Sequence, residues 1–403
     1  MDQSPYLNVE AFYDTTDESW KDHWNHSLSA YENSRNILAR AVALPCAEIQ
    51  LPVAIAYAWT NAKWSRVLGI HLAFGPEGSG KSTVAKFARG LRETESWGEA
   101  CSFASVRNYL QGVKYLDEEC EMEADGAALI LDNVYSSTFQ GSDNKLRSLI
   151  LSGYKKADDR LIISSTTAGE NLHFRTFSTK LISSVDPIHE SYELRELRRR
   201  LLFTIHKKWE EMGEDERPDF DMSERIDFDD MSFSGIFESE YLRIYGADTA
   251  KGQRGPVNIV KYAEARKAAK RSRSYPAHFT AERKEICIDP IATLLLIGGC
   301  ETVREGIEIF SRYWEFVDAR MAEGSDILKQ HLQPLLLPFE EAAKYNGGCV
   351  KVPMTLINQS LSAKHQAGEF MDKPRGKDVY DAMRQLGFSA STESSKTVWI
   401  RSV

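Results

Sequence analysis

The chain has 403 residues, of which 42% are hydrophobic, and this length is enough for two or three domains with sizeable cores. The formal net charge of −9 excludes a protein whose whole surface is basic, so any contact with nucleic acid must come from local patches. Six cysteines without a C-x-x-C pair argue against a zinc ribbon and against a disulfide framework.

The sequence predicts a cytoplasmic protein. No apolar stretch reaches the length needed to span a membrane. The first residues lack a basic region followed by an apolar run, so we expect no signal peptide.

Composition and periodicity divide the chain into five expected segments. They are a helical lead-in (1–65), a P-loop ATPase core (66–209), an acidic linker (210–235), a helical region (236–345) and a winged-helix domain (346–403). A second helix of the lead-in is expected to begin at Pro52, because proline is tolerated in a first helical turn.

The strongest motif is a phosphate-binding loop that fits the pattern G-x-x-x-x-G-K-[ST]. It consists of Gly75, Pro76, Glu77, Gly78, Ser79, Gly80, Lys81, Ser82 and Thr83. A short apolar stretch precedes it and a helix-like stretch follows it, which is the context expected for a true site.

The residue types of this loop suit the binding of ATP with Mg²⁺. Its glycines allow successive N–H groups to point inward, and the helix that opens at Lys81 adds the positive end of its dipole. Lys81 can reach the β- and γ-phosphates, and the Ser82 hydroxyl can hold Mg²⁺.

A buried strand over 127–131 ends in Asp132 and Asn133. The Asp132 carboxylate is expected to reach the Mg²⁺ shell opposite Ser82. Asn133 stands where many ring-forming ATPases carry a glutamate. An amide can orient a water but cannot accept its proton, so either hydrolysis is slow or the base lies elsewhere, with Glu77 as a remote option.

A third strand is expected over 161–167, and polar residues at its end are candidates for sensing the γ-phosphate. Thr166 is the predicted sensor, with Ser165 and Thr167 as its neighbours. The alternative is a polar strand end that only turns the chain.

An arginine cluster enters a further strand near 201–205, and Arg198 and Arg200 are candidate arginine fingers. In an oligomeric ATPase such an arginine reaches the γ-phosphate of a neighbouring subunit and stabilises charge in the transition state. The alternative is a solvated basic segment paired with Glu193 and Glu196.

The helical region contains a basic run that suits contact with a phosphate backbone. Its candidate DNA-binding residues are Lys267, Lys270, Arg271 and Arg273, and the alternative is a solvated helix face. Later helices are expected over 288–297, 302–322 and 325–344, with Pro334 and Pro338 interrupting the last.

The final segment has the pattern of a winged helix. Two helices, opening near 352 and spanning 376–386, precede a hairpin around 390–396, and Gly387 is placed to end the second helix. Lys377, Arg384 and Lys396 are the candidate DNA contacts of this segment.

Residues 68–206 resemble the AAA+ and superfamily-3-like ATPases of phage, plasmid and genomic-island replication modules. The matching pieces are 75–83, 129–133, 151–156, 162–170 and 197–202. The resemblance implies an α/β P-loop NTPase core, helicase-like activity on DNA and a homo-oligomer, with a hexameric ring as one form. Two residues depart from the pattern: Asn133 replaces an acidic residue, and Thr166 stands where these helicases often have asparagine.

The sequence therefore favours an ATP-dependent DNA-acting motor, a helicase or replication initiator of a mobile genetic element. Two alternatives remain open. Asn133 favours a nucleotide-gated DNA-binding switch, such as a transposition or partition regulator. The acidic balance of the chain favours a protein-binding signalling or defence ATPase.

Overall fold

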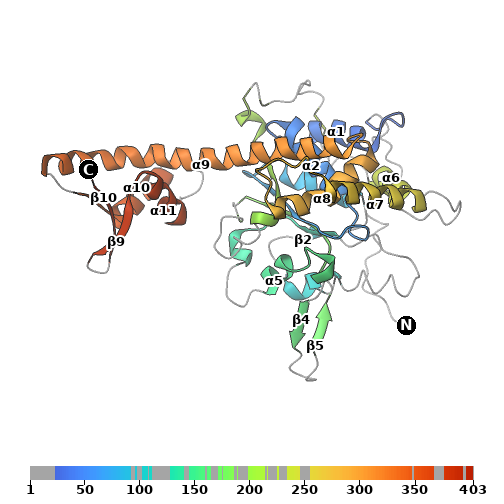
Figure 1. The fold of residues 1–403 in the computed structure, drawn as a ribbon, viewed down its shortest axis with the longest axis horizontal. Helices are drawn as coiled ribbons and strands as arrows, with labels where there is room; N and C mark the ends of the chain where they lie inside the picture. The colour runs from blue at the N-terminus through green and yellow to red at the C-terminus, as the bar shows by residue number, and fades with distance from the viewer. Residues whose placement is uncertain are drawn as a thin grey trace. The chain divides into compact units, whose positions relative to one another are not determined.

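The fold is that of a computed structural model. It describes residues 23–91, 96–97, 102–107, 109–110, 128–139, 145–158, 161–164, 171–174, 176–185, 188, 198–213, 216, 225–226, 234–245, 255–346, 349–366, 376–393 and 396–402. The chain divides into two compact units, 1–313 and 314–403 (Figure 1). The expected lead-in, ATPase core and much of the expected helical region therefore belong to one unit.

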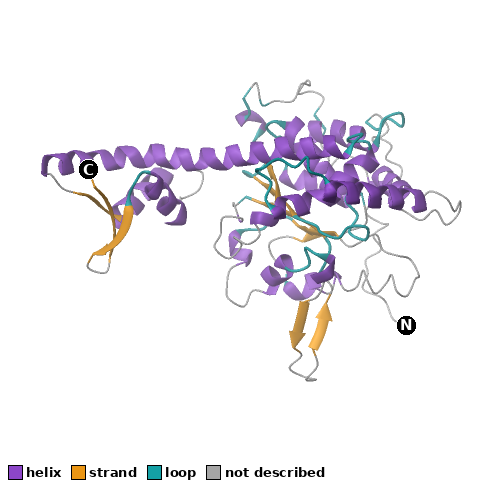
Figure 2. Ribbon diagram, in the orientation of Figure 1, coloured by secondary structure: helices purple, strands orange, loops and turns teal. Residues whose placement is uncertain are grey.

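A five-stranded parallel sheet forms the centre of the first unit (Figure 2). Its strands are β1 (Ile70–Phe74), β2 (Ser96–Trp97), β3 (Ala128–Leu131), β6 (Thr179–Ser184) and β7 (Leu201–Ile205), in the order β2-β3-β6-β1-β7. All neighbouring pairs are parallel, so all strands end at the same edge. The predicted α/β class is confirmed.

The central strands are buried along almost their whole length, as expected for a parallel sheet covered on both faces. The strand β6 lies between β1 and β3 and pairs with both. Its carboxyl end therefore lies between the end of the strand that leads into the phosphate loop and the end of the strand that leads into Asp132.

Helices of the first unit pack around this sheet. They are α1 (Ala30–Ala41), α2 (Ala47–Trp59), α3 (Lys81–Gly90), α5 (Lys145–Leu151), α6 (Ser234–Tyr245), α7 (Gly255–Arg271) and α8 (Ala281–Ile297). Short 3-10 turns cover Ser136–Phe139, Lys156–Asp158, Arg198–Arg200 and Trp209–Glu211. A capping box between Ser29 and Glu32 begins α1, since each side chain bonds the other's backbone N–H.

The helix α2 is buried along almost its whole length and joins the amino ends of two strands. The Tyr57 hydroxyl lies 2.6 Å from the Gly69 carbonyl and accepts a 2.9 Å hydrogen bond from the Lys180 amide. Pro52 lies inside α2 rather than at its start, so the predicted boundary was wrong. Burial of the helix offsets the hydrogen bond that proline cannot donate.

The strand β7 pairs only with β1 among the described strands, so its other edge has no strand partner. Side chains from two helices form hydrogen bonds with backbone groups along this edge. The Ile205 amide donates to Gln50 Oε1 at 2.7 Å. The Tyr313 hydroxyl accepts from the Phe203 amide and donates to the Phe203 carbonyl at 3.0 Å. These hydrogen bonds give partners to backbone groups that an edge strand otherwise leaves unpaired.

The strand predicted over 161–167 does not join the parallel sheet. Its described part, β4 (Leu161–Ser164), pairs antiparallel with β5 (Asn171–Phe174). Figure 1 shows this two-stranded hairpin projecting from the rest of the unit. The apolar run predicted a strand here, but it could not predict the partner of that strand, because pairing depends on residues distant in sequence. The strand β6 lies next to β1, the strand that leads into the phosphate loop.

A single helix, α9 (Val303–Asn346), replaces the two helices predicted over 302–344. Pro334 and Pro338 lie inside it and do not end it. Each proline removes only one backbone donor. Leu332 and Leu336 of the same stretch are fully buried in the core of the second unit, which stabilises the helix there.

The second unit combines helices with a small antiparallel sheet. Its further elements are β8 (Cys349–Pro353), α10 (Met354–Gln366), α11 (Gly376–Gln385), β9 (Ser389–Glu393) and β10 (Lys396–Ser402), and the strand order is β8-β10-β9. Gly387 has φ +84°, and the Phe388 amide donates to the Met383 carbonyl, so the chain turns sharply after α11. The hairpin was predicted, whereas the strand β8 was missed.

A buried carboxylate joins α7 and α8 to the segment before β1. Asp289 is fully buried and accepts hydrogen bonds from the amides of Arg66 (3.2 Å) and Val67 (3.1 Å). Tyr262 Oη and Arg266 Nε each donate to its other oxygen at 2.8 Å. Burial raises the pKa of Asp289, and the Arg266 charge and these hydrogen bonds oppose that shift.

We expect Asp289→Ala to destabilise the first unit strongly, because it leaves Arg266 and the amides of Arg66 and Val67 without this acceptor. Removing one partner of a buried ion pair costs about 3–5 kcal/mol. Urea unfolding followed by circular dichroism measures this loss. The control Arg304→Ala removes an exposed ion pair with Glu308 and is expected to cost less than about 1 kcal/mol. Equal unfolding midpoints for the two variants would contradict the prediction.

Candidate nucleotide site

The phosphate-binding loop connects β1 to α3 at the carboxyl edge of the parallel sheet. Gly80 precedes the helix with φ +79°, a conformation that glycine adopts without strain. A Cβ on Gly75 would lie 2.4 Å from the His206 carbonyl oxygen, so no larger residue fits there. The glycines of the motif are therefore required by the backbone that they form.

The Lys81 side chain lies within the loop and is buried. Its Nζ donates to the Pro76 carbonyl at 2.6 Å, and Ser79 Oγ donates to the same carbonyl at 2.7 Å. Burial lowers the pKa of Lys81, and the charges of Glu77 and Asp132 oppose that shift. A phosphate group in this loop would offer the ammonium a stronger partner than a neutral carbonyl.

The structure brings the two predicted metal ligands together. Ser82 Oγ, in the first turn of α3, donates to Asp132 Oδ1 at 2.8 Å. Ser183 Oγ, on β6, also donates to Asp132 Oδ1. Carboxylate and hydroxyl oxygens are ligands that Mg²⁺ accepts, so these residues fit the ion.

Asn133 follows Asp132 and lines the same pocket. Its φ of +52° lies in the left-handed region, which asparagine tolerates better than most residues. The backbone N–H of Asn133 donates to Ser183 Oγ at 2.9 Å. Ser183 therefore bonds to both Asp132 and Asn133. Ser183 was not predicted as a site residue, because the polar end of an earlier strand, near Thr166, was expected beside the phosphate loop.

Thr166, the predicted sensor, lies outside the described residues, as do Ser165 and Thr167. The strand β4 that leads toward it pairs with β5 and not with β1 or β3. The polar residues that do end a strand beside the phosphate loop are Ser183 and Ser184 of β6. Residues 161–165 also end in two serines, so the local sequence did not indicate which pair lies beside the phosphate loop.

The predicted arginine fingers lie at the opposite edge of the sheet from the phosphate loop, because β7 begins directly after them and runs parallel to β1. Arg200 Nη1 donates to the Leu151 carbonyl at 2.9 Å, and its guanidinium carbon lies 3.9 Å from the centre of the Tyr154 ring. Arg198 is exposed and bonds to no other residue in the described part of the chain. Arg200 thus has contacts within its own unit, whereas Arg198 is exposed to solvent.

A buried polar chain supports the loop from behind. His206 Nδ1 lies 3.2 Å from the Ser79 carbonyl, and its Nε2 lies 3.1 Å from Thr204 Oγ1. His71 Nε2 lies 3.4 Å from the same hydroxyl. A carbonyl only accepts, so His206 Nδ1 carries a hydrogen and Thr204 donates to Nε2. Burial lowers the pKa of both His71 and His206 to about 3, so both imidazoles are uncharged at neutral pH.

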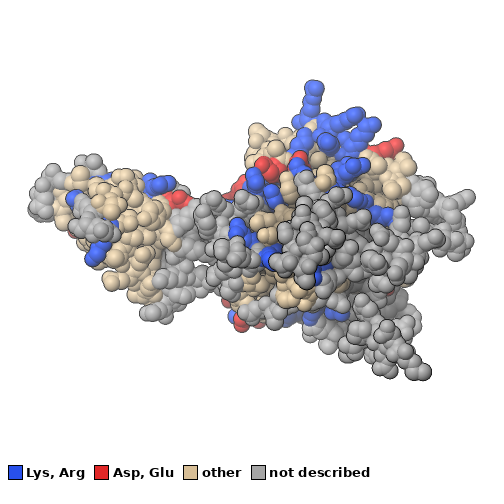
Figure 3. All heavy atoms as spheres, turned by 90° about the horizontal axis from the view of Figure 1, so that it is seen from below, with Lys and Arg blue, Asp and Glu red and all other residues tan. Residues whose placement is uncertain are grey.

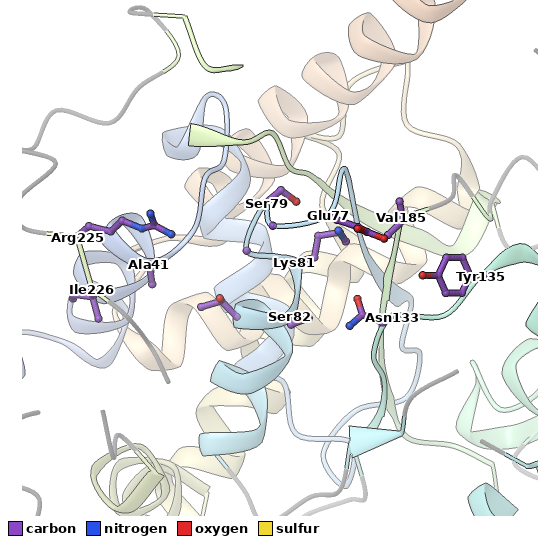
Figure 4. Close-up of a pocket in the computed structure, with 13 residues that line it drawn as sticks. Ala41, Glu77, Ser79, Lys81, Ser82, Asn133, Tyr135, Val185, Arg225 and Ile226 are labelled. Atoms are coloured by element: carbon purple, nitrogen blue, oxygen red, sulfur yellow. The ribbon is translucent and has the colours of Figure 1, made fainter. Parts of the chain in front are cut away.

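The loop opens onto a cavity of about 700 Å³. Figure 4 shows Ala41, Arg225 and Ile226 at one end of it, Tyr135 and Val185 at the other, and the phosphate-loop residues between them. These five residues were not predicted as site residues. Arg225 and Ile226 fall in the segment interpreted as an acidic linker, where nothing local indicated a role in the site.

The predicted DNA-binding residues are exposed where they are described. In the first unit these are Lys267, Lys270, Arg271 and Arg273, and in the second unit Arg384 and Lys396. Lys377 lies in α11, but its side chain is outside the described part. Figure 3 shows Lys and Arg side chains gathered on one side of the molecule.

The described residues contain no cluster of three or more His, Cys, Asp and Glu side chains placed to hold a metal ion. A site that holds Mg²⁺ mainly through one carboxylate, one hydroxyl, waters and a phosphate needs no such cluster. Within the same part of the chain, no helix combines the length and apolarity needed to cross a membrane.

The neutral histidines predict a specific dependence of stability on pH. The pKa of His206 in the folded protein is about 3, below its ordinary value of 6.5. As the pH falls, the unfolded protein therefore binds a proton at this histidine before the folded protein does. Its contribution to stability is complete above about pH 6.5 and is lost as the pH falls toward 3. We expect His206→Gln, which can still donate to Ser79, to reduce the slope of unfolding free energy by up to about 1.4 kcal/mol per pH unit below pH 6. Urea titrations between pH 4.5 and 8 measure the slope, and parallel curves for both proteins would contradict the assignment.

A scan against protein-family models found no match, and a search of curated proteins found none either. A search of solved structures found similarity to the A form apo structure of the C-terminal region of NrS-1. It shares 12% identity with this chain, and the alignment covers 91% of this chain and 78% of that one. The TM-score is 0.27, so this similarity supports no argument about fold or function.

Proposed function

We propose that this protein binds ATP with Mg²⁺ and hydrolyses it to act on DNA. The observation that carries the proposal is the hydrogen bond between Ser82 and Asp132 beside a glycine-shaped phosphate loop. Ser82 lies in the helix that follows β1 and Asp132 directly follows β3, and their meeting at one sheet edge is what a phosphate and metal site requires.

Each residue of the site has a distinct role in this proposal. The loop amides and Lys81 bind the β- and γ-phosphates, and Ser82 and Asp132 hold Mg²⁺. When bound, Mg²⁺ neutralises charge on the phosphate oxygens. Ser183 bonds to Asp132 and orients it, and Asn133, which lines the cavity, is the residue that we assign to orienting the attacking water.

The end of the cavity formed by Ala41, Arg225 and Ile226 suits the nucleoside part of ATP. Ala41 and the buried Ile226 offer apolar surface to a base. Arg225 lies over the Trp209 ring with its guanidinium carbon 5.6 Å from the ring centre, so an aromatic side chain supports it.

The link to DNA rests on the exposed cations of α7 and on the second unit. We interpret the second unit as a winged helix, because α9, α10 and α11 pack with a three-stranded sheet ending in a hairpin. Its exposed Arg384 and Lys396 suit phosphate contacts. These exposed cations and the winged-helix interpretation, together with the sequence resemblance, favour a ring-forming helicase or replication initiator of a mobile genetic element.

A nucleotide-gated DNA-binding switch is the second candidate. Asn133 favours it, because an amide at this position cannot accept the proton of the attacking water. Glu77 lines the cavity and is the remaining carboxylate candidate for a base. A motor is expected to turn over faster when DNA is added, whereas a switch is expected to change its affinity for DNA between ATP and ADP without rapid turnover.

ATP turnover tests the proposal directly. We expect Lys81→Ala to lose most ATP binding, and Asp132→Asn to lower kcat by about 100-fold or more with a smaller change in nucleotide affinity. Phosphate release, measured with and without single-stranded and duplex DNA, and binding of a fluorescent ATP analogue provide the readouts. Unchanged nucleotide binding by Lys81→Ala would reject the site.

The two arginines are expected to behave differently. Arg198→Ala should leave nucleotide binding and thermal stability intact and remove the part of turnover that rises with protein concentration, because Arg198 has no partner in its own described chain. Arg200→Ala should lower the melting temperature, since it loses contacts with Leu151 and Tyr154. Turnover that rises with concentration equally in Arg198→Ala and in the unaltered protein would exclude a finger at this position.

A further inference from the structure

A buried histidine outside the motif contacts the phosphate loop. His206 directly follows β7, and its backbone N–H donates to the Phe74 carbonyl at 2.8 Å, at the end of the strand that leads into the loop. The His206 side chain is buried, and His206 is not among the described residues that line the nucleotide cavity. Its Nδ1 lies 3.2 Å from the Ser79 carbonyl oxygen. The imidazole therefore reaches the loop from behind, with the loop between it and the cavity.

The chemistry of the partners fixes which ring nitrogen of His206 carries the hydrogen. A carbonyl oxygen only accepts, so the hydrogen bond to Ser79 requires a hydrogen on Nδ1. A neutral imidazole has one N–H, so Nε2 is an acceptor and the Thr204 hydroxyl, at 3.1 Å, donates to it. The same hydroxyl oxygen lies 3.4 Å from His71 Nε2, which makes that nitrogen its donor. Thr204 thus favours the tautomer in which His206 presents a donor to the loop.

The planar peptide after Ser79 converts this hydrogen bond into a direction for the next amide. The Ser79–Gly80 peptide is trans, so the Ser79 carbonyl and the Gly80 N–H point in opposite directions. Because His206 holds the carbonyl behind the loop, the Gly80 N–H points toward the cavity, which Ser79 and Gly80 both line. A rotation of this peptide would instead turn a carbonyl oxygen toward a bound anion.

The loop needs such a constraint at this peptide. Ser79 lies between Gly78 and Gly80, which have φ values of +76° and +79°. Glycine has the least restricted backbone of all residues, so these two positions by themselves leave the orientation of the peptide weakly determined. Ser79 Oγ donates to the Pro76 carbonyl at 2.7 Å, and the hydrogen bond from His206 fixes the carbonyl of the same residue. A loop that is ordered in advance loses less conformational entropy when it binds a ligand.

We propose that His206 is a positioning residue of the phosphate site: its Nδ1–H holds the Ser79 carbonyl away from the cavity and thereby aims the Gly80 N–H at a phosphate oxygen of the nucleotide. Thr204 assists by holding the tautomer of His206. The histidine itself does not touch the nucleotide. This inference rests on the proposed nucleotide binding and adds to it a residue from outside the phosphate-loop motif.

Nucleotide affinity of two His206 variants in the full chain tests the role. His206→Leu has a similar size and lacks a donor, and we expect it to weaken ATP binding by about tenfold, because a hydrogen bond to a charged group is lost. His206→Gln can still donate to Ser79 and should bind ATP within about threefold of the unaltered protein. Competition against a fluorescent ATP analogue measures both affinities. An equal loss in the two variants would reject the role of the donor.

Two comparisons separate positioning from a general loss of stability. Inorganic triphosphate has only the phosphate part of the ligand, so its affinity should fall by the same factor as that of ATP in His206→Leu. The control Tyr313→Phe removes a hydroxyl that bonds to the Phe203 backbone on the same strand, β7. It should lower the melting temperature and leave ATP affinity unchanged. A fall in ATP affinity in this control as large as in His206→Leu would contradict the proposal.

The tautomer provides a readout that does not depend on the folding of His206→Leu. NMR of the protein with isotope-labelled histidine should show a hydrogen on Nδ1 of His206 and none on Nε2, with the signal assigned by its loss in His206→Gln. Thr204→Val keeps the imidazole and removes the hydroxyl, and it should weaken ATP binding by about threefold.

The outcomes distinguish this inference from the proposed function. Unchanged ATP affinity in folded His206→Leu and in Thr204→Val, or a hydrogen on Nε2 of His206, would overturn the positioning role and leave the nucleotide site standing. Absence of ATP binding by the unaltered protein would overturn both.

Discussion

The parallel pairing of β1, β6 and β3 is the constraint on which the candidate site depends. Parallel strands end at one edge, and this places the phosphate loop, Ser183 and Asp132 side by side although they are far apart in sequence. The hydrogen bonds from Ser82 and Ser183 to Asp132 follow from that register. A shift of one residue in either pairing would point these side chains to the other face of the sheet.

Buried polar groups hold this edge and the opposite one. The His71–Thr204–His206 chain reaches the Ser79 carbonyl and fixes the loop from behind. Asp289 joins the segment before β1 to two helices of the surrounding layer. Each network is closed by hydrogen bonds, which is the condition under which burial of polar groups is tolerated.

The phosphate loop of the first unit combines backbone amides with a single buried lysine, a combination that suits a triphosphate.

The sequence by itself determined the phosphate loop, Asp132 at the end of a buried strand, and the α/β class, because these depend on local patterns of glycine, charge and apolar residues. The tertiary structure decided which strand pairs beside the loop. Residues 161–164 and 179–184 both form strands, and only long-range pairing put the second in the sheet and the first in a hairpin. It also decided that Arg200 contacts Tyr154 while Arg198 is exposed, and that Arg225 reaches the nucleotide cavity. Such contacts join residues distant in sequence, which no local pattern encodes.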